Sequence, residues 1–420
     1  MKTYKLFDDG KSDTNSRPIY ERELRIPVEL DKPIYTFRNM SDAEFTIFAE
    51  KLRVHLYNLW LSGHSVFYSN KDADEIAEDC LKLVRESPDS FFETYKGKKI
   101  ITHKNFNVAY QWFPEMADVK VNSKSMIDQL RDPKIFRQNL YDILIKDRQK
   151  NGANSYDMET LSKFLLDSLR IVNRFQPVFN FPSIIAKLIY MKVVSTKPNQ
   201  NEWYILDPCG GWAGRFAGLL AAMCTPLFND KRIHFYTTDV NTATAGRFEM
   251  FLDFWNIHIK SDLKELCDLY RSFEPAETLL NDPIFSKMEN MFDIAFTSPP
   301  YYEREKYSMD INQSYIKYKT YAEWRDGFLT GLIRSCYRLL KPGSLFLLNI
   351  ADSNDNSGKE SFYPLQDDSI RIAESIGFTL IDTYYMVQHR FPGYTDEKYV
   401  IEIRGKKKKF EPIYVFQKGN

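Results

Sequence analysis

The sequence predicts an α/β fold with a mostly parallel, twisted sheet flanked by helices, and a mainly helical N-terminal domain in front of it. Three observations support this prediction. From about residue 175, short apolar runs end in turn residues and alternate with helical patterns, which is typical of parallel sheets with crossover helices. One of these runs leads through a glycine-rich turn into a helix. Before residue 150, the clearest patterns are amphipathic helices with capping residues.

The composition is that of a globular protein: 420 residues, 43% hydrophobic and 27% charged, with zero formal net charge. Without a positive field over the whole chain, any phosphate binding must come from local patches. Five cysteines lie far apart and none forms C-x-x-C, which argues against a zinc cluster or a disulfide framework and suits a reducing compartment. No stretch resembles a signal peptide or a membrane span. We therefore expect a soluble, cytoplasmic protein without a metal.

The N-terminal region begins with two helical patterns. In the stretch 41–63, Ser41 and Glu44 form a capping box and apolar residues recur at helical spacing. Residues 72–86 form a second amphipathic pattern, and 98–113 mix alternation with β-branched residues, which predicts one or two strands.

These patterns divide the chain into three parts. We expect a helical or mixed N-terminal domain over residues 1–150 and a linker with a lead-in helix over 151–174. The main α/β domain then covers residues 175–420.

The stretch YILDPCGGWAGRFAGLLAA (204–222) predicts a strand that ends at Asp207, then a turn and a helix. Three glycines allow tight backbone turns and the close approach of a ligand: Gly210, Gly211 and Gly214. Such a turn at the carboxyl end of a parallel strand is where nucleotide-like ligands bind, and a turn without a ligand is the alternative reading.

Asp239 ends the next predicted strand and could accept hydrogen bonds from the two hydroxyls of a ribose. Its distance from Asp207 exceeds the roughly 20 residues of a dinucleotide site, and neither G-x-G-x-x-G nor G-K-[ST] is present, which argues against NAD and against a P-loop. Cys209 lies inside the glycine turn with no neighbouring histidine to activate it, so we expect packing and no nucleophilic role.

The stretch DIAFTSPPYYERE (293–305) places Ser298, two prolines and Tyr301 directly after a buried strand. Pro299 and Pro300 cannot donate backbone hydrogen bonds and hold φ near −65°, so the chain leaves the strand in one rigid conformation. Carbonyl oxygens and the Ser298 hydroxyl then act as acceptors beside a flat aromatic ring. This combination suits a planar substrate that carries an amino group.

At these two motifs the sequence resembles a known enzyme family. TSPPY resembles the catalytic motif of the amino-methyltransferases that act on exocyclic nitrogens of DNA bases, and DPCGGWAGR resembles their S-adenosylmethionine loop. Three further stretches resemble that family's surrounding segments: FPSIIAKLIY (181–190), the helix, L-K-P-G turn and strand over 321–350, and EPIYVFQKG (411–419). The resemblance covers about residues 175–420.

This resemblance implies a Rossmann-like methyltransferase domain, S-adenosyl-L-methionine as the cofactor, and double-stranded DNA with a flipped target base as the partner. The catalytic residues implied are Ser298, Pro299, Pro300 and Tyr301. The cofactor-binding residues implied are Asp207, Cys209, Gly210, Gly211, Gly214 and Asp239, with Phe181 near the methionine end and Asp282 near the adenine. The serine form resembles the N4-cytosine branch, whereas the N6-adenine branch more often has Asp or Asn there.

Several readings stay open. The same chemistry on N6 of adenine is the second hypothesis, transfer to RNA or a free nucleotide the third, and a non-catalytic cofactor-binding subunit the fourth. The N-terminal region carries Lys96, Lys98, Lys99 and Lys104 among aromatic residues, and it serves either as the DNA-recognition region or as a stabilising cap. The run Lys406–Lys409 reads as a solvated loop or a phosphate contact. The sequence defines neither the target site nor the oligomeric state.

Overall fold

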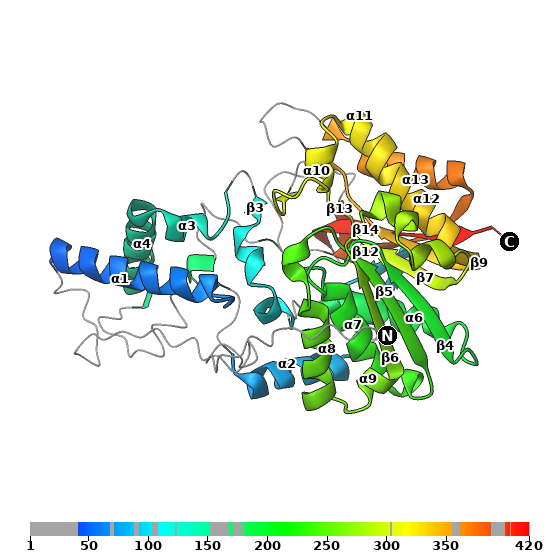
Figure 1. Cartoon of the computed structure of the whole chain (residues 1–420), viewed down its shortest axis with the longest axis horizontal. Helices are drawn as coiled ribbons and strands as arrows, with labels where there is room; N and C mark the ends of the chain where they lie inside the picture. The colour runs from blue at the N-terminus through cyan, green and yellow to red at the C-terminus, as the bar shows by residue number, and fades with distance from the viewer. Residues whose placement is uncertain are drawn as a thin grey trace.

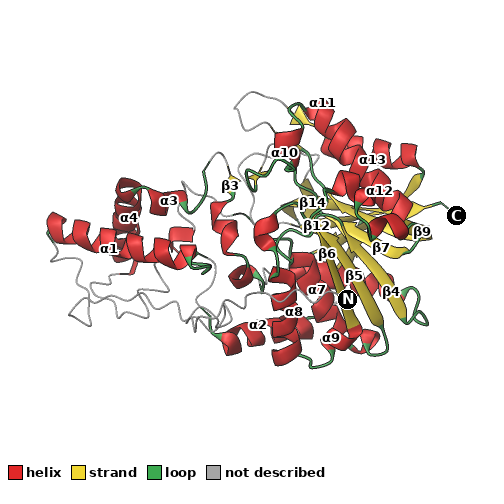
Figure 2. Ribbon diagram, in the orientation of Figure 1, coloured by secondary structure: helices red, strands yellow, loops and turns green. Residues whose placement is uncertain are grey.

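The computed structural model confirms the α/β fold, with helices on both sides of one large sheet (Figures 1 and 2). It describes residues 41–67, 71–87, 92–102, 108–121, 124–151, 168–170, 178, 180–302, 305–354, 362–387, 400–403 and 405–419. The segment 1–30, most of the linker and lead-in helix, and Lys104 lie outside the described residues. No helix among the described residues is both long and apolar enough to cross a membrane.

The large sheet has ten strands, and nine of them follow the order β1-β2-β12-β14-β9-β7-β4-β5-β6, with β13 paired to β14. Their bounds are β1 Phe92–Tyr95, β2 Lys98–Ile101, β4 Glu202–Asp207, β5 Arg232–Thr238, β6 Cys267–Ser272, β7 Phe292–Thr297, β9 Leu340–Asn349, β12 Phe378–Val387, β13 Val400–Ile403 and β14 Lys406–Lys418. Two small ribbons pair β3 (Lys120–Val121) with β8 (Glu305–Lys306) and β10 (Ser353–Asn354) with β11 (Phe362–Tyr363).

The centre of the sheet is parallel. Strands β9, β7, β4, β5 and β6 all pair in parallel with one another in that order. Strand β14 runs antiparallel between β9 and β12, and β2 pairs in parallel with β12. The predicted mostly parallel sheet is therefore present, and its parallel strands all end at one edge.

The strands bury both of their faces, which explains why they read as apolar runs in the sequence. Successive residues alternate between the two main hydrophobic clusters. Ile205 and Ile294 belong to one cluster, and the residues that follow them, Leu206 and Ala295, belong to the other. One face is covered by α2 (Ala73–Arg85), α6 (Ser183–Ser195), α7 (Gly214–Met223) and α8 (Arg247–His258). The other is covered by α12 (Thr330–Leu339) and α13 (Leu365–Ile376).

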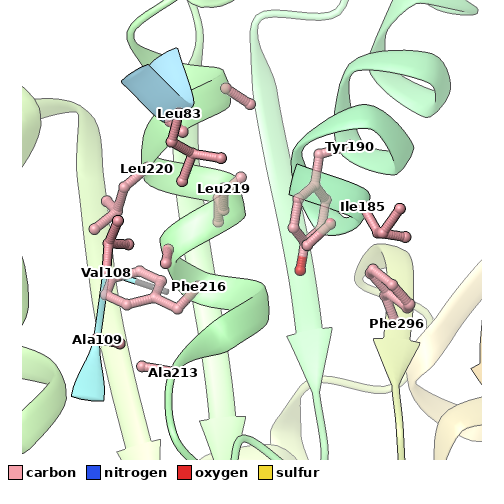
Figure 3. Packing of buried hydrophobic residues seen from close by; sticks show 14 of the residues in the cluster. Leu83, Val108, Ala109, Ile185, Tyr190, Ala213, Phe216, Leu219, Leu220 and Phe296 are labelled. Atoms are coloured by element: carbon pink, nitrogen blue, oxygen red, sulfur yellow. The ribbon is translucent and has the colours of Figure 1, made fainter. Parts of the chain in front are cut away.

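The first of these faces has a tightly packed core (Figure 3). Phe216 and Leu220 of α7 lie beside Val108, and Leu83 of α2 reaches the same helix from the other end. On the neighbouring α6, Tyr190 and Ile185 lie near Phe296 of β7, with the Tyr190 and Phe296 ring centroids 5.7 Å apart. A segment from the N-terminal region thus shares a core with the sheet.

The remaining helices are shorter or lie outside the sheet layers. Their bounds are α1 Asp42–Leu61, α3 Asp128–Arg131, α4 Pro133–Asn151, α9 Leu263–Leu266, α10 Ser314–Lys317 and α11 Tyr321–Glu323. There are 3-10 helices over Tyr110–Trp112, Pro114–Asp118, Pro226–Phe228, Thr242–Thr244, Ala276–Asn281 and Phe285–Lys287. A π-helical turn over Trp324–Leu329 joins α11 to α12. Helix α1 begins at the predicted capping box, in which Ser41 and Glu44 each accept the other's backbone N–H.

Helices α1, α3 and α4 form a lobe beside the large sheet, with β3 between the two (Figure 1). The lobe has its own hydrophobic cluster, which includes Phe48, Leu52 and Leu140. By contrast, β1 and β2 extend the large sheet, and Ile76, Cys80 and Leu83 of α2 pack into its core. The expected end of the N-terminal domain near residue 150 stays a prediction. Of the described residues before it, some belong to the lobe and others to the large sheet and its core.

Candidate active site

The two sequence motifs meet where the strand order reverses. Strand β4 lies between β5 and β7, so the chain leaves β4 toward one side of the sheet and later returns to the other side. Ile205 and Leu206 of β4 pair with Ile294 and Ala295 of β7. In open α/β sheets, ligands bind beyond the carboxyl ends of the strands at such a switch point. The glycine loop after β4 and S-P-P-Y after β7 are therefore neighbours at this edge.

The three glycines of the loop are required for two reasons, close packing and a left-handed backbone. A Cβ on Gly210 would lie 2.2 Å from Oγ1 of Thr237, and one on Gly214 would lie 2.4 Å from the carbonyl oxygen of Phe181. Gly211 instead has φ +52°, in the left-handed region that favours glycine. The loop is thus pressed against β5 and against the segment before α6, and Gly211 in its turn is half-buried.

Asp207 and Arg215 form a buried ion pair at the base of this loop. Nε of Arg215 lies 2.8 Å from one oxygen of Asp207, and a terminal guanidinium nitrogen lies 3.0 Å from the other. The same guanidinium donates to the Cys209 carbonyl, and the Cys209 N–H donates to Asp207 at 3.3 Å. Burial raises the pKa of Asp207, and Arg215 opposes that shift. The pair holds the turn between strand and helix in one conformation.

Asp239 follows β5 and faces the glycine loop. One carboxylate oxygen accepts the Gly211 N–H at 2.9 Å and the other accepts the Asn241 N–H at 2.9 Å. A carboxylate offers about four acceptor sites, so about two remain for other donors. Asp239 is half-buried, and its remaining lone pairs can accept from a ligand in the loop.

Phe181 lies against the same loop. The Arg215 guanidinium carbon is 5.4 Å from the centre of its ring, which also packs edge-on against Phe296 at 5.4 Å. The adjacent Asn180 donates its amide N–H to the Trp212 carbonyl at 2.6 Å. Burial raises the pKa of the Cys209 thiol well above its ordinary value, so the thiol stays protonated and is a weak nucleophile.

Asp282 makes many internal hydrogen bonds. Its carboxylate accepts from the Tyr270 hydroxyl at 3.1 Å, from the Ser272 hydroxyl at 2.6 Å, and from the backbone N–H groups of Ile284 and Phe285 at 2.8 and 3.2 Å. These bonds fix the segment after β6. The contact of Asp282 with a bound adenine stays a prediction.

Ser298 begins the S-P-P-Y segment directly after β7. Its hydroxyl donates to Oδ1 of Asn349 at 3.0 Å, and Nδ2 of Asn349 donates to the Pro412 carbonyl at 3.0 Å. The second bond fixes which way the Asn349 amide points. Because its proton is engaged, the Ser298 oxygen keeps its lone pairs for an incoming donor.

The two tyrosines that follow differ in their surroundings. Tyr301 is half-buried, and its hydroxyl oxygen accepts the Ala351 N–H at 3.1 Å, which anchors the ring beside the end of β9. Tyr302 is 5% exposed, donates to the Lys319 carbonyl at 3.0 Å, and packs edge-on against Tyr363. Of the two, only Tyr301 leaves part of its ring accessible beside Ser298.

A basic hairpin projects from the same edge of the sheet. Strand β14 pairs with β12 only as far as Phe410 opposite Val387, so Lys406–Lys409 extend past the end of β12 and pair with β13. Since β14 runs against the parallel strands, its first residues lie at the edge where those strands end. Of the two interpretations of this run, the solvated loop is wrong, because Lys406–Lys409 are strand. The run lies at the carboxyl edge that carries both motifs, and a phosphate contact stays a prediction.

Sequence reasoning missed Asn349 and Asn180. Asn349 carries a weak signal, as the polar residue that closes the apolar run LFLL. Its partnership with Ser298 depends on the pairing of β7 with β9 and is not visible in the sequence. Among the described residues, no group of three histidine, cysteine or acidic side chains could hold a metal ion.

The C-terminal part of the chain is similar to known proteins. Residues 292–420 match a family described as DNA methylase, of the N6/N4 type. A Type II beta methyltransferase, M.BslI from Bacillus sp. (strain NEB-606), is 39% identical over 101 residues. That match spans 22% of this chain and 10% of the relative's length.

Solved structures with related arrangements are distant in sequence. A protein from Thermus thermophilus, described as a DNA modification methylase, is 22% identical over 35% of this chain and 51% of its own, with a TM-score of 0.24. An O-methyltransferase from Thermotoga maritima is 11% identical over 60% of this chain and 71% of its own, with a TM-score of 0.33.

Proposed function

We propose that the chain transfers a methyl group from S-adenosylmethionine to the exocyclic amino group of a DNA base, with N4 of cytosine favoured. The match of residues 292–420 to the N6/N4 DNA methylase family and the likeness to a Type II methyltransferase support transfer to an amino group of DNA. The observation that supports this proposal most directly is the geometry of Ser298. Its oxygen lies at the switch point beside the glycine loop, with its proton donated to Asn349.

The residues of the loop fit S-adenosylmethionine. Asp239 has acceptor capacity left for ribose hydroxyls, Gly211 allows the tight turn of the loop, and Phe181 offers an aromatic ring beside the loop. Asp207, Cys209, Gly210 and Gly214 shape this surface from below, and Asp282 fixes the segment next to it. When bound, the cofactor supplies an electrophilic methyl group on sulfur.

The chain's own part in the reaction is to orient the acceptor nitrogen. An exocyclic amino nitrogen is a poor nucleophile because its lone pair is delocalised into the base. Ser298 Oγ and the Pro299 carbonyl accept its two N–H bonds, which lets the nitrogen become pyramidal and direct its lone pair at the methyl group. Pro300 fixes the direction of the chain, and Tyr301 stacks on the base.

A neutral serine is an adequate acceptor but a weak base. The extra proton on nitrogen therefore leaves to water after transfer, when the methylated amino group is acidic enough to lose it without a strong base. The base cannot be reached inside a duplex and is flipped out of the stack. The basic strand Lys406–Lys409 at the same edge suits contact with the DNA backbone.

The test is to incubate the protein with S-adenosylmethionine and unmethylated DNA, digest the DNA to nucleosides and identify the product by mass spectrometry. N4-methyldeoxycytidine is the expected product. N6-methyldeoxyadenosine would keep the mechanism and overturn the choice of base. The absence of any methylated deoxynucleoside would favour RNA, a free nucleotide or a non-catalytic subunit.

A further inference from the structure

The turn that follows S-P-P-Y exposes two large apolar side chains. Met309 is 83% exposed and Ile311 is 76% exposed, the highest values among the large hydrophobic residues of the described chain. Exposed apolar residues scattered singly are ordinary on protein surfaces. Two at the tip of one turn, beside a candidate active site, make a feature that a partner could bind.

Internal hydrogen bonds hold this turn in shape. The Asn312 N–H donates to Oδ1 of Asp310 at 2.8 Å, and the Gln313 side chain donates to Oγ of Ser308 at 3.1 Å. The Gln313 N–H also donates to the Asp310 carbonyl at 3.0 Å. Exposing Met309 and Ile311 on an ordered turn costs free energy in water, yet the turn does not fold them inward.

The base of the turn is tied to both sides of the site. The ring of Tyr307 lies 6.1 Å from that of Trp212, which belongs to the glycine loop. Directly before it, Glu305 and Lys306 form β8 and pair with β3. The exposed tip is therefore fixed relative to the catalytic motif, which ends only a few residues earlier in the chain.

The ribbon beneath the tip carries an unfavourable pair of charges. Lys120 of β3 lies directly opposite Lys306 of β8, and both side chains are exposed. Like charges in this position destabilise an antiparallel pair. Within the described part of the chain, neither ammonium has a carboxylate at salt-bridge distance. A polyanion across the ribbon would relieve this repulsion.

Resting on the proposed function, we propose that the turn 307–313 is the element that opens the DNA duplex: Met309 and Ile311 enter the base stack at the position the target base leaves, while Lys120 and Lys306 contact the flanking phosphates. Duplex DNA offers both complementary surfaces at once, phosphates outside and flat apolar base faces inside. Methionine and isoleucine are among the side chains that proteins insert between base steps.

The experiment compares the double variant Met309→Ala/Ile311→Ala with wild type on two DNA substrates. One is a fully paired duplex containing a site mapped by methylation; the other is the same duplex with the target base mispaired. On the paired duplex we expect kcat/KM to fall about tenfold to a hundredfold, because opening a paired base is costly. On the mispaired duplex we expect kcat/KM to fall about threefold or less, because a mispaired base takes less free energy to open.

Ile257→Ala is the control, because Ile257 on α8 is 66% exposed and its truncation also removes exposed apolar surface. It should leave both substrates unchanged. An equal loss of kcat/KM on the two substrates would overturn the inference, and so would no loss on either substrate. If the equal loss came with a changed oligomeric state, the turn would be a contact between copies of the chain. If wild type methylates no DNA, the proposed function fails and this inference fails with it.

Discussion

The Ser298 hydroxyl and the Asn349 side chain are joined across two neighbouring parallel strands, with Oγ 3.0 Å from Oδ1. Each residue comes at the end of its strand, β7 or β9, and Asn349 is held from behind by the Pro412 carbonyl of β14. Three strands thus determine the direction in which one hydroxyl group presents its lone pairs.

Asn349→Ala should lower kcat about tenfold, the effect of about 1.4 kcal/mol in the barrier, and leave the Kd for S-adenosylmethionine within about twofold. The reason is that the Ser298 hydroxyl could then turn its proton toward the substrate nitrogen. The measurement is a double-mutant cycle with Ser298→Ala. If Asn349 acts through Ser298, removing it in the Ser298→Ala background should cost little further. Losses that simply add would contradict this role.

Two variants of Tyr301 distinguish the effect of ring stacking from the effect of hydrogen bonding. Tyr301→Ala should reduce turnover on DNA by roughly 5- to 150-fold, since stacking of a base on an aromatic ring is worth about 1–3 kcal/mol. Tyr301→Phe keeps the ring and loses the bond from the Ala351 N–H, so it should retain most activity. Single-turnover kinetics and calorimetric titration of S-adenosylmethionine test both variants. Equal activity of Tyr301→Ala and wild type would remove this residue from the mechanism.

Asp239→Asn should weaken binding of S-adenosylmethionine roughly tenfold or more, because an amide offers a donor where a hydroxyl needs an acceptor. The change also disturbs the bonds from Gly211 and Asn241. Equilibrium titration of the cofactor gives the Kd, with DNA affinity measured in parallel. Asp253→Asn, at a half-exposed position on α8, is the control. Unchanged cofactor affinity in Asp239→Asn would rule out the ribose contact.

Glu115 should make stability depend on pH. Burial raises the pKa of this carboxyl from 4.5 to about 7, against the opposing effect of Arg247, whose Nε lies 3.8 Å away. Between pH 4.5 and 7 the folded chain therefore binds more protons than the unfolded chain. The stability that the protonated form contributes is fully present below pH 4.5 and is lost as the pH rises through 7.

Glu115→Gln removes this titration, so its stability relative to wild type should rise between pH 5 and pH 8 by an amount on the order of 2–3 kcal/mol. Thermal unfolding followed by intrinsic fluorescence at both pH values measures it. Glu265→Gln, at an exposed position on α9, should show no such trend. A difference between Glu115→Gln and wild type that is the same at both pH values would show that the carboxyl does not titrate in this window.

Local patterns were enough to predict much of the fold. The capping box at Ser41, the apolar runs that became β4, β5, β7 and β9, and the glycine turn between β4 and α7 all depend on residues close together in sequence. Both motifs follow strands that the sequence predicted, and the parallel pairing of β4 with β7 brings the glycine loop and S-P-P-Y to the same edge of the sheet.

Other features depend on contacts between distant segments. The run Lys406–Lys409 reads as a loop until its pairing with β13 is known. Strand β2 connects to the rest of the sheet through β12, where Lys99 lies opposite Tyr384. The residues near β2 in the sequence do not indicate this register. The bond between Ser298 and Asn349 has the same origin, since the register of β7 against β9 sets it.

The position of β14 within the sheet has a consequence for synthesis on the ribosome. Residues 406–418 are translated after every other described strand, yet they lie between β9 and β12. Until they emerge, β12, β2 and β1 have no described strand that connects them to the five parallel strands, and Asn349 has no Pro412 carbonyl to hold it. The nascent chain must therefore keep two open sheet edges apart and protected until β14 inserts, which makes this late step the one most exposed to aggregation.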